Sequence, residues 1–225
     1  MRALIAILAL ALLAACTSFQ DLLARKPRPA LGFRYIEPLL DDGFENGDMW
    51  RKYETRPSLF LGVHAGAFRI DFSGRKYVWT QREGAFSDVV IEAEAAQKSD
   101  YDHNAYGLAC RLDPANTGRG YFLLISGDGY ASIRWSNGRS LTPIVSAAPS
   151  AHIRQAPASN RIRVVCVDDY LALWVNGEFV ADVRDGRATQ GAVGLAGVMN
   201  YEGRRLTVDF DDVKVWRAAL DEGDS

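Results

Sequence analysis

Apolar and polar residues alternate along residues 160–183, NRIRVVCVDDYLALWVNGEFVADV, a pattern that predicts three antiparallel strands joined by two tight turns. The Asp168-Asp169 pair predicts the first turn. If that turn has two residues, the register places six apolar side chains on one face, as the cross-strand pairs Cys166 with Leu171, Val164 with Leu173, and Ile162 with Val175. Turn chemistry and hydrophobic pattern therefore agree, and we expect this segment to form the centre of a half-buried sheet.

The second turn, Asn176-Gly177, is a strong hairpin signal because both residues tolerate a positive φ. Two loop lengths remain open. A strict two-residue loop would turn Glu178 and Asp182 toward the core. A three-residue loop with a bulge would bury a different, apolar set, namely Phe179, Ala181 and Val183. We favour the three-residue loop, since burying a carboxylate without a partner costs several kcal/mol.

Short alternating runs recur along most of the remaining chain, separated by glycine-rich breaks. We expect the domain to begin near residues 33–40, strands near residues 59–63, 68–72, 77–80, 86–96, 106–112, 120–126, 130–135, 192–199 and 206–216, and a long loop at 141–159. No repeat of 20–50 residues is visible, which argues against a propeller. The pattern predicts an all-β fold, a sandwich or jelly roll of about twelve strands.

The N-terminus has the features of an export signal. A short positive start, Met1-Arg2, precedes an apolar run at residues 3–15 that is too short to favour a transmembrane anchor. The run ends in Leu13-Ala14-Ala15-Cys16, which resembles a bacterial lipobox. That resemblance implies cleavage before Cys16 and lipidation of its sulfur and new amine. Thr17 at the next position implies the outer membrane; an ordinary signal peptide is the alternative.

Charge and composition fit a single exported domain. The 225 residues carry a formal net charge of −2, and no basic run interleaved with aromatics appears, so nucleic-acid binding is disfavoured. We expect four segments: a signal peptide at 1–15, a tether at 16–32, a β-sandwich domain at 33–217 and a polar tail at 218–225.

Several loose motifs occur in an order that is typical of one superfamily. They are Asp41-Asp42-Gly43-Phe44, Phe86-Ser87-Asp88-Val89, and the runs at 106–111, 121–130, 160–177 and 208–213. In this order they resemble the concanavalin A-like lectins and glucanases, close to the laminin G-like jelly rolls. The resemblance covers about residues 33–216 and implies two antiparallel sheets, one concave and one convex.

The resemblance also implies candidate chemistry. Laminarinases and lichenases of this fold carry a Glu-x-Asp-x-x-Glu strand, to which Glu92-Ala93-Glu94 is the nearest match, although the third acid is missing. A glycoside hydrolase using Glu92 and Glu94 is therefore an alternative to a solvated strand face. Aspartates similar to Asp42 and Asp211 help bind a structural calcium in those enzymes, with turn capping as the alternative.

Other catalytic arrangements are not visible. No Gly-x-Ser-x-Gly motif occurs, and His64, His103 and His152 are isolated in the sequence.

Cys110 and Cys166 both fall on the apolar faces of their strands. Because export leads to an oxidising compartment, we expect a cross-strand disulfide between them, with two buried free thiols as the alternative.

Sugars are held by aromatic faces and planar polar groups, and Trp174, Tyr130 and Arg134 are the candidate ligand-binding residues. Tyr130 and Arg134 share a strand face that Trp135 does not.

Three functions remain open at this point. The first is a non-catalytic, lipid-anchored envelope module that binds a glycan or a partner protein. The others are a laminarinase-like hydrolase and a structural envelope lipoprotein.

Overall fold

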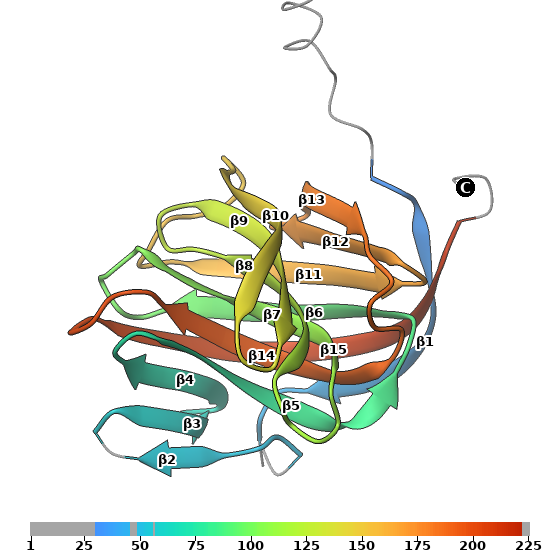
Figure 1. The fold of residues 1–225 in the computed structure, drawn as a ribbon. Coiled ribbons are helices and arrows are strands. Elements are labelled where there is room, and N and C mark those ends of the chain that lie inside the picture. Colours follow the sequence, from blue (N-terminus) through green and yellow to red (C-terminus); the bar gives the residue numbers. More distant parts are fainter. Residues whose placement is uncertain (1–29, 46–48, 56, 222–225) are drawn as a thin grey trace, which may run out of the picture. The chain divides into compact units, whose positions relative to one another are not determined.

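A computed structural model describes residues 30–45, 49–55 and 57–221 of the chain. The expected signal peptide, Cys16 and most of the tether lie outside the described residues. Within them, the chain forms fifteen β-strands in two antiparallel sheets that pack face to face, which confirms the predicted all-β sandwich (Figure 1). None of the described residues belongs to a helix long and apolar enough to cross a membrane.

The larger sheet, which we call sheet A, has nine strands. They are, in order, β13 (Glu178–Arg184), β12 (Tyr170–Val175), β11 (Ser159–Val167), β6 (Val89–Gln97), β15 (Arg205–Leu220), β4 (Ala67–Ser73), β3 (Leu59–His64) and β2 (Tyr53–Thr55), with β1 (Phe33–Asp42) also paired to β15. The first and last strands thus lie side by side, Phe33 opposite Leu220. The pairing takes β15 three residues past the expected domain end at 217.

The smaller sheet, sheet B, has six strands. They are, in order, β10 (Leu141–Pro149), β9 (Tyr130–Asn137), β8 (Arg119–Ile125), β7 (Asn104–Leu112), β14 (Gly191–Met199) and β5 (Lys76–Phe86).

Residue parity sets the core between the sheets. On β4, Phe68, Ile70 and Phe72 are fully buried while the residues between them are not, as expected for a strand with one face in the core. On β6, Val89, Ile91, Ala93 and Ala95 point inward, which leaves Glu92 and Glu94 on the outer face of sheet A.

Strands β11 and β12 adopt the predicted register. Ile162 pairs with Val175, Val164 with Leu173, and Cys166 with Leu171, and all six side chains belong to the core. Asp168-Asp169 is the first turn, with Asp168 at φ 50°. Local turn chemistry and apolar parity were therefore sufficient to fix this part of the fold.

The second hairpin differs from the favoured loop. Val175 pairs with Glu178, so the loop has two residues, Asn176 and Gly177, at φ 54° and 90°. The bulge lies further along, because Trp174 pairs with Phe179 and Leu173 with Ala181. Ala181 and Val183 pack on the core as expected, but Phe179 contacts Trp174 on the outer face instead. Without a bulge, a two-residue loop would turn Glu178 and Asp182 toward the core. The bulge after the turn places Ala181 and Val183 there instead.

The prediction of a loop at 141–159 is also wrong for the first half of that range. Residues 141–149 form β10, the edge strand of sheet B, with two register shifts against β9. Pro143 and Pro149 hid the strand from sequence analysis, yet proline is tolerated at an edge because its missing N–H faces away from the sheet.

Cys110 and Cys166 form a disulfide with a Cα–Cα distance of 6.8 Å. Cys110 lies on β7 of sheet B and Cys166 on β11 of sheet A, so the bond joins the two sheets through the core.

Candidate functional site

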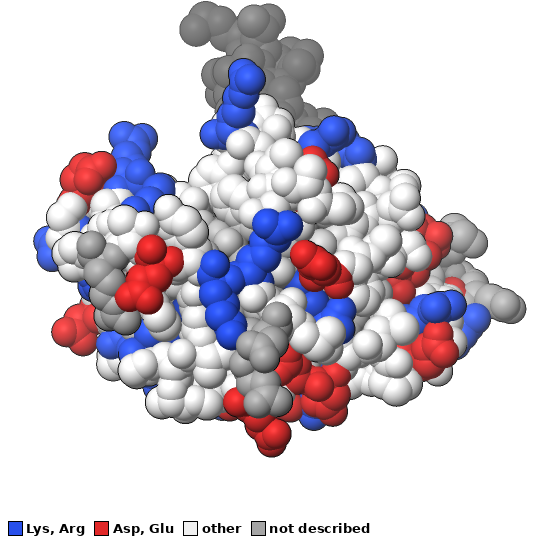
Figure 2. Space-filling view, turned by 90° about the horizontal axis from the view of Figure 1, so that it is seen from below, with Lys and Arg blue, Asp and Glu red and all other residues white. Residues whose placement is uncertain are grey.

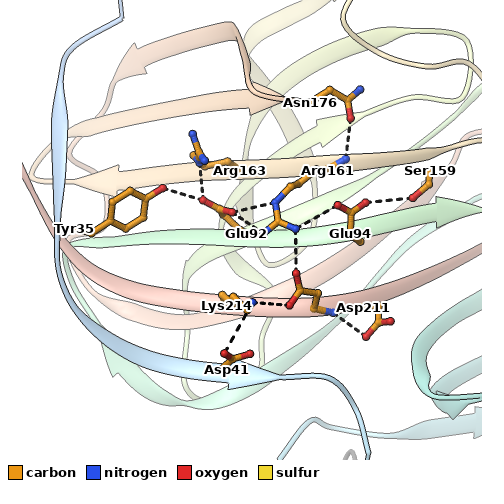
Figure 3. Close-up of polar contacts among 11 residues, drawn as sticks. Tyr35, Asp41, Glu92, Glu94, Ser159, Arg161, Arg163, Asn176, Asp211 and Lys214 are labelled. Atoms are coloured by element: carbon orange, nitrogen blue, oxygen red, sulfur yellow. Dashed lines mark hydrogen bonds and ion pairs between the residues drawn. The ribbon is translucent and has the colours of Figure 1, made fainter.

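Glu92 lies at the centre of an ion-pair network on the outer face of sheet A (Figure 3). Its side chain is 7% exposed and receives hydrogen bonds from Tyr35 Oη at 2.8 Å, Arg161 Nη2 at 2.8 Å and Arg163 Nε at 2.7 Å. Burial raises the pKa of Glu92, but these hydrogen bonds outweigh it and the net pKa is lowered. The carboxylate is therefore held ionised, with both oxygens occupied.

The network continues through neighbouring strands. Arg161 Nη1 also contacts Glu94 at 3.3 Å and Asp212 at 3.0 Å, and Lys214 Nζ contacts Asp212 at 2.8 Å. Together these contacts link β1, β6, β11 and β15 (Figure 3). A glycosidase acid must carry a proton at working pH. Glu92 is instead held ionised, and both Glu92 and Glu94 pair with guanidinium groups, an arrangement suited to joining strands.

Trp174 also lies on the outer face of sheet A, where other rings cover it. It is 9% exposed and packs between Phe33, at 5.3 Å between ring centroids, and Phe179, at 5.5 Å. Phe33 in turn contacts Tyr35, and Tyr35 contacts Trp216. The indole face is thus used by the protein and is not available to stack on a sugar.

Asp42 has a partner for each carboxylate oxygen. Oδ1 accepts a hydrogen bond from the Phe44 amide and Oδ2 from Trp50 Nε1, both at 2.8 Å. Asp211 Oδ1 accepts from the Asp212 amide at 2.8 Å. The described residues contain no group of three His, Cys, Asp or Glu side chains placed to hold a metal ion. These hydrogen bonds are those of turn-capping aspartates, the alternative to calcium ligation, and the calcium site stays a prediction.

The outer face of sheet B has a different composition. Small and apolar side chains cover its middle, namely Ala105, Ala109, Phe122, Leu124, Ala192, Ala196 and Val198. Tyr77 and Trp79 on β5 flank this surface, with their rings stacked at 5.5 Å and 24°. Ser132 and Arg134 on β9 lie across from Leu124 and Phe122 of β8. Polar groups and rings therefore border an apolar floor.

A pocket of about 240 Å³ opens on this face. We call it the Arg134 pocket; its lining includes Ala105, Leu124, Tyr130, Ser132, Arg134 and Tyr201. Tyr130 and Tyr201 are 41% and 53% exposed. The structure thus brings together Tyr130 and Arg134, two of the predicted ligand-binding residues, and separates them from Trp174 on the opposite sheet.

Sequence analysis missed the aromatic residues at the mouth of this pocket. Tyr201 follows β14, and its ring lies 6.5 Å from His103 and 5.8 Å from Tyr101. The Arg204 guanidinium lies 4.8 Å from the Tyr101 ring. Residues 101–103 and 201–204 come from separate turns, so no local pattern predicts that they meet.

His103 and Asp128 also meet at this pocket, although His103 is isolated in the sequence. His103 Nδ1 hydrogen bonds with Asp128 Oδ2 at 2.8 Å, and Ser126 Oγ donates to Asp128 Oδ1. In a hydrolytic triad the serine contacts the histidine. Here the serine contacts the aspartate, so the arrangement fixes a loop and does not activate a nucleophile.

A second pocket, of about 600 Å³, lies where β5 meets β2 and β3. We call it the Trp79 pocket. Its lining includes Tyr53, Trp79 and the core residues Leu61 and Val78, and Trp79 Nε1 donates to Asn116 Oδ1 at 2.9 Å. Part of its wall is therefore the open edge of the core rather than a sheet face.

Acidic and basic side chains are interspersed on the face shown in Figure 2. That face presents no continuous basic surface of the kind that follows a nucleic-acid backbone.

Neither a protein-family model nor a curated protein sequence matches this chain. Solved structures do match it. The carbohydrate binding module CBM66 from Bacillus subtilis aligns with a TM-score of 0.62 at 14% identity, covering 76% of this chain and 97% of that one. A galectin-like protein of unknown function from Bacillus subtilis aligns at 0.61, with 11% identity and coverage of 83% and 98%.

A Bacillus licheniformis β-glucanase aligns with a TM-score of 0.57 at 9% identity, covering 81% of this chain and 99% of the enzyme. The chain therefore has the concanavalin A-like jelly-roll fold. This fold is common to carbohydrate-binding modules and glycoside hydrolases, and identities this low establish the fold alone.

Proposed function

We propose that this protein is a non-catalytic, lipid-anchored envelope module that binds carbohydrate on the outer face of sheet B, at the Arg134 pocket. One observation carries the proposal. The pocket presents the exposed rings of Tyr130 and Tyr201 beside the Arg134 guanidinium and the Ser132 hydroxyl, over an apolar floor. Rings that stack on sugar faces and polar groups that orient hydroxyls are the usual parts of a sugar site.

The carboxylates argue for binding rather than hydrolysis. Glycosidases place two carboxyl groups about 5–9.5 Å apart across the scissile bond. Asp128 is the single carboxylate among the described residues that line the Arg134 pocket, and it is held by His103 and Ser126. Glu92 and Glu94, the hydrolase candidates, lie on the opposite sheet.

Calorimetric titration of the 225-residue chain with a panel of oligosaccharides tests the proposal. We expect at least one saccharide to bind, with no release of reducing ends on long incubation. Tyr201→Ala should weaken binding by roughly three- to tenfold, the size of one lost aromatic contact. Tyr53→Ala is the matched control, because Tyr53 is 58% exposed but lies at the Trp79 pocket.

Three results would contradict the proposal. If no saccharide in the panel binds, this face is not a carbohydrate site. If Tyr53→Ala weakens binding and Tyr201→Ala does not, the sugar binds at the Trp79 pocket instead. If the wild-type chain releases reducing ends, the protein is a hydrolase and not a non-catalytic binding module.

The lipid anchor depends on the sequence at Leu13-Ala14-Ala15-Cys16. Acyl chains on Cys16 would hold the protein at the outer membrane, at about 0.8 kcal/mol per buried methylene. Mass spectrometry of the mature N-terminal peptide should find Cys16 first and acylated. An unmodified cysteine, or a Cys16→Ser variant that stays in the membrane fraction, would contradict anchoring through this residue.

A further inference from the structure

Arg134 is partly buried and lacks an acidic partner. Its Nε donates to Ser132 Oγ at 3.1 Å, and neither Nη1 nor Nη2 has a hydrogen bond or ion pair with any residue that the structure describes. Burial lowers the pKa of the Arg134 guanidinium, and no nearby carboxylate offsets this effect. A cation in this position has lost part of its hydration without receiving an ion pair in return.

Three other buried or partly buried arginines among the described residues have an acidic partner. Arg69 contacts Asp209 at 2.6 Å through a side chain that is 23% exposed, and Arg163 contacts Glu92 at 2.7 Å with 33% exposed. Even Arg111, whose side chain has no exposed surface, lies 3.7 Å from Asp88 and donates to backbone carbonyls. The guanidinium of Arg134 differs from these three in having no carboxylate of the described residues within contact distance.

The surroundings of Arg134 leave its free N–H groups available to a ligand. Phe122 lies opposite on β8 and Pro143 opposite on β10, and neither side chain can accept a hydrogen bond. The carboxylate of Asp128 lines the same pocket, but it forms no ion pair with Arg134 and is occupied by His103 and Ser126. Arg134 is thus the group in this pocket with unused hydrogen-bonding capacity and a full charge.

We infer that the saccharide bound in the Arg134 pocket is anionic, and that its carboxylate or sulfate group pairs with Nη1 and Nη2 of Arg134. This inference rests on the proposed function. A planar guanidinium binds two oxygens of such a group at once, with charge-assisted hydrogen bonds. At about 240 Å³ the pocket is smaller than the roughly 300–1,000 Å³ of sites that enclose drug-sized ligands, so it suits one acidic sugar unit.

The test compares matched ligands on the 225-residue chain. Oligogalacturonate is titrated beside the same oligosaccharide after reduction of its carboxyl groups, and a sulfated galactan beside its desulfated form. We expect the anionic member of at least one pair to bind roughly tenfold or more tightly than its neutral partner. Inorganic sulfate alone shows whether a free anion suffices without a sugar ring.

Three variants assign the effect to one side chain. Arg134→Gln should remove the preference for the anionic member, and Arg134→Lys, which keeps the charge but not the fork, should restore only part of it. Arg139→Gln is the control, because Arg139 lies in the next turn of the same sheet and is exposed. It should leave both affinities unchanged.

The outcomes separate this inference from the proposed function. If neutral saccharides bind as tightly as acidic ones, or Arg134→Gln keeps the preference, the acidic ligand is wrong while the carbohydrate site stands. If Arg139→Gln removes the preference as completely as Arg134→Gln does, net charge and not the pocket causes it, and the inference fails. If inorganic sulfate binds and no saccharide does, the site is an anion site and the proposed function fails.

Discussion

The outer faces of the two sheets differ in how their charges are paired. On sheet A, Glu92 is surrounded by Arg161, Arg163 and Tyr35, and each of these groups has a protein partner (Figure 3). On sheet B, Arg134 donates a hydrogen bond to one hydroxyl group and forms no ion pair with a carboxylate of the described residues. The middle of the sheet B face is also apolar.

The difference teaches where function is to be sought in this fold. Ion pairs that satisfy each other join strands and leave little for a ligand to bind. Desolvated groups without partners carry a free-energy cost that a ligand can relieve. By this criterion sheet A has a structural face, which fixes β1 to the sandwich, and sheet B has the face that we propose for binding.

The largest expected effect comes from the disulfide, which belongs to both sheets. Replacing Cys110 and Cys166 together by alanine should lower the free energy of unfolding by on the order of 4 kcal/mol, because the bond closes a long loop in the unfolded chain. Urea denaturation measures the loss. Saccharide affinity should stay unchanged below the transition, since neither cysteine lines the Arg134 pocket. A variant as stable as the wild type would contradict the disulfide's stabilising role.

Glu92→Gln should affect stability but not binding. Removing the charge weakens hydrogen bonds to Arg161 and Arg163 and should cost about 2 kcal/mol, since both guanidinium groups retain some solvent contact. Glu94→Gln is the matched control: its side chain is 40% exposed, and the expected cost is below about 1 kcal/mol. Thermal melts measure both. If Glu92→Gln abolishes saccharide binding at unchanged stability, the assignment of the two faces is reversed.

The contribution of Glu92 to the free energy of unfolding should decrease as the pH falls. Because the folded-state pKa is lowered from 4.5, the stabilisation is present above pH 4.5 and is lost as the pH falls through the folded-state pKa. The stability difference between wild type and Glu92→Gln, measured in urea at several pH values, should therefore shrink in acid. A difference that stays constant from pH 7 to about pH 2 would show that the charge of Glu92 is not responsible.

The smallest expected effect is that of calcium. Asp42 and Asp211 have protein partners, so a chelator should leave the melting temperature unchanged and added calcium should not raise it. A rise in melting temperature that Asp42→Asn removes would restore the calcium site implied by the family resemblance.

Local parity and turn chemistry predicted much of the fold. The register of β11 and β12 follows from which residues alternate and from a two-residue turn. Edge strand β10 was not predicted because it contains Pro143 and Pro149, which are typical of loops. The bulge at Phe179 was misplaced because its position depends on how the strand packs, not on the turn.

The candidate site was harder to predict because its parts are distant in the sequence. Tyr130 and Arg134 share one strand face, which parity revealed. Tyr201 and His103 reach the same pocket from separate turns. Trp174 was a reasonable candidate by parity, but Phe33, contributed by the first strand, covers it.

Chemical-shift mapping of the isotope-labelled chain with a bound saccharide tests the assignment of the two faces most directly. The account predicts shifts at the amides of Ala105, Ser132, Arg134 and Tyr201 on the sheet B side, and unchanged signals at Glu92 and Arg161. Shifts concentrated at Glu92, Arg161 and Trp174, with none at Ser132 or Arg134, would contradict it.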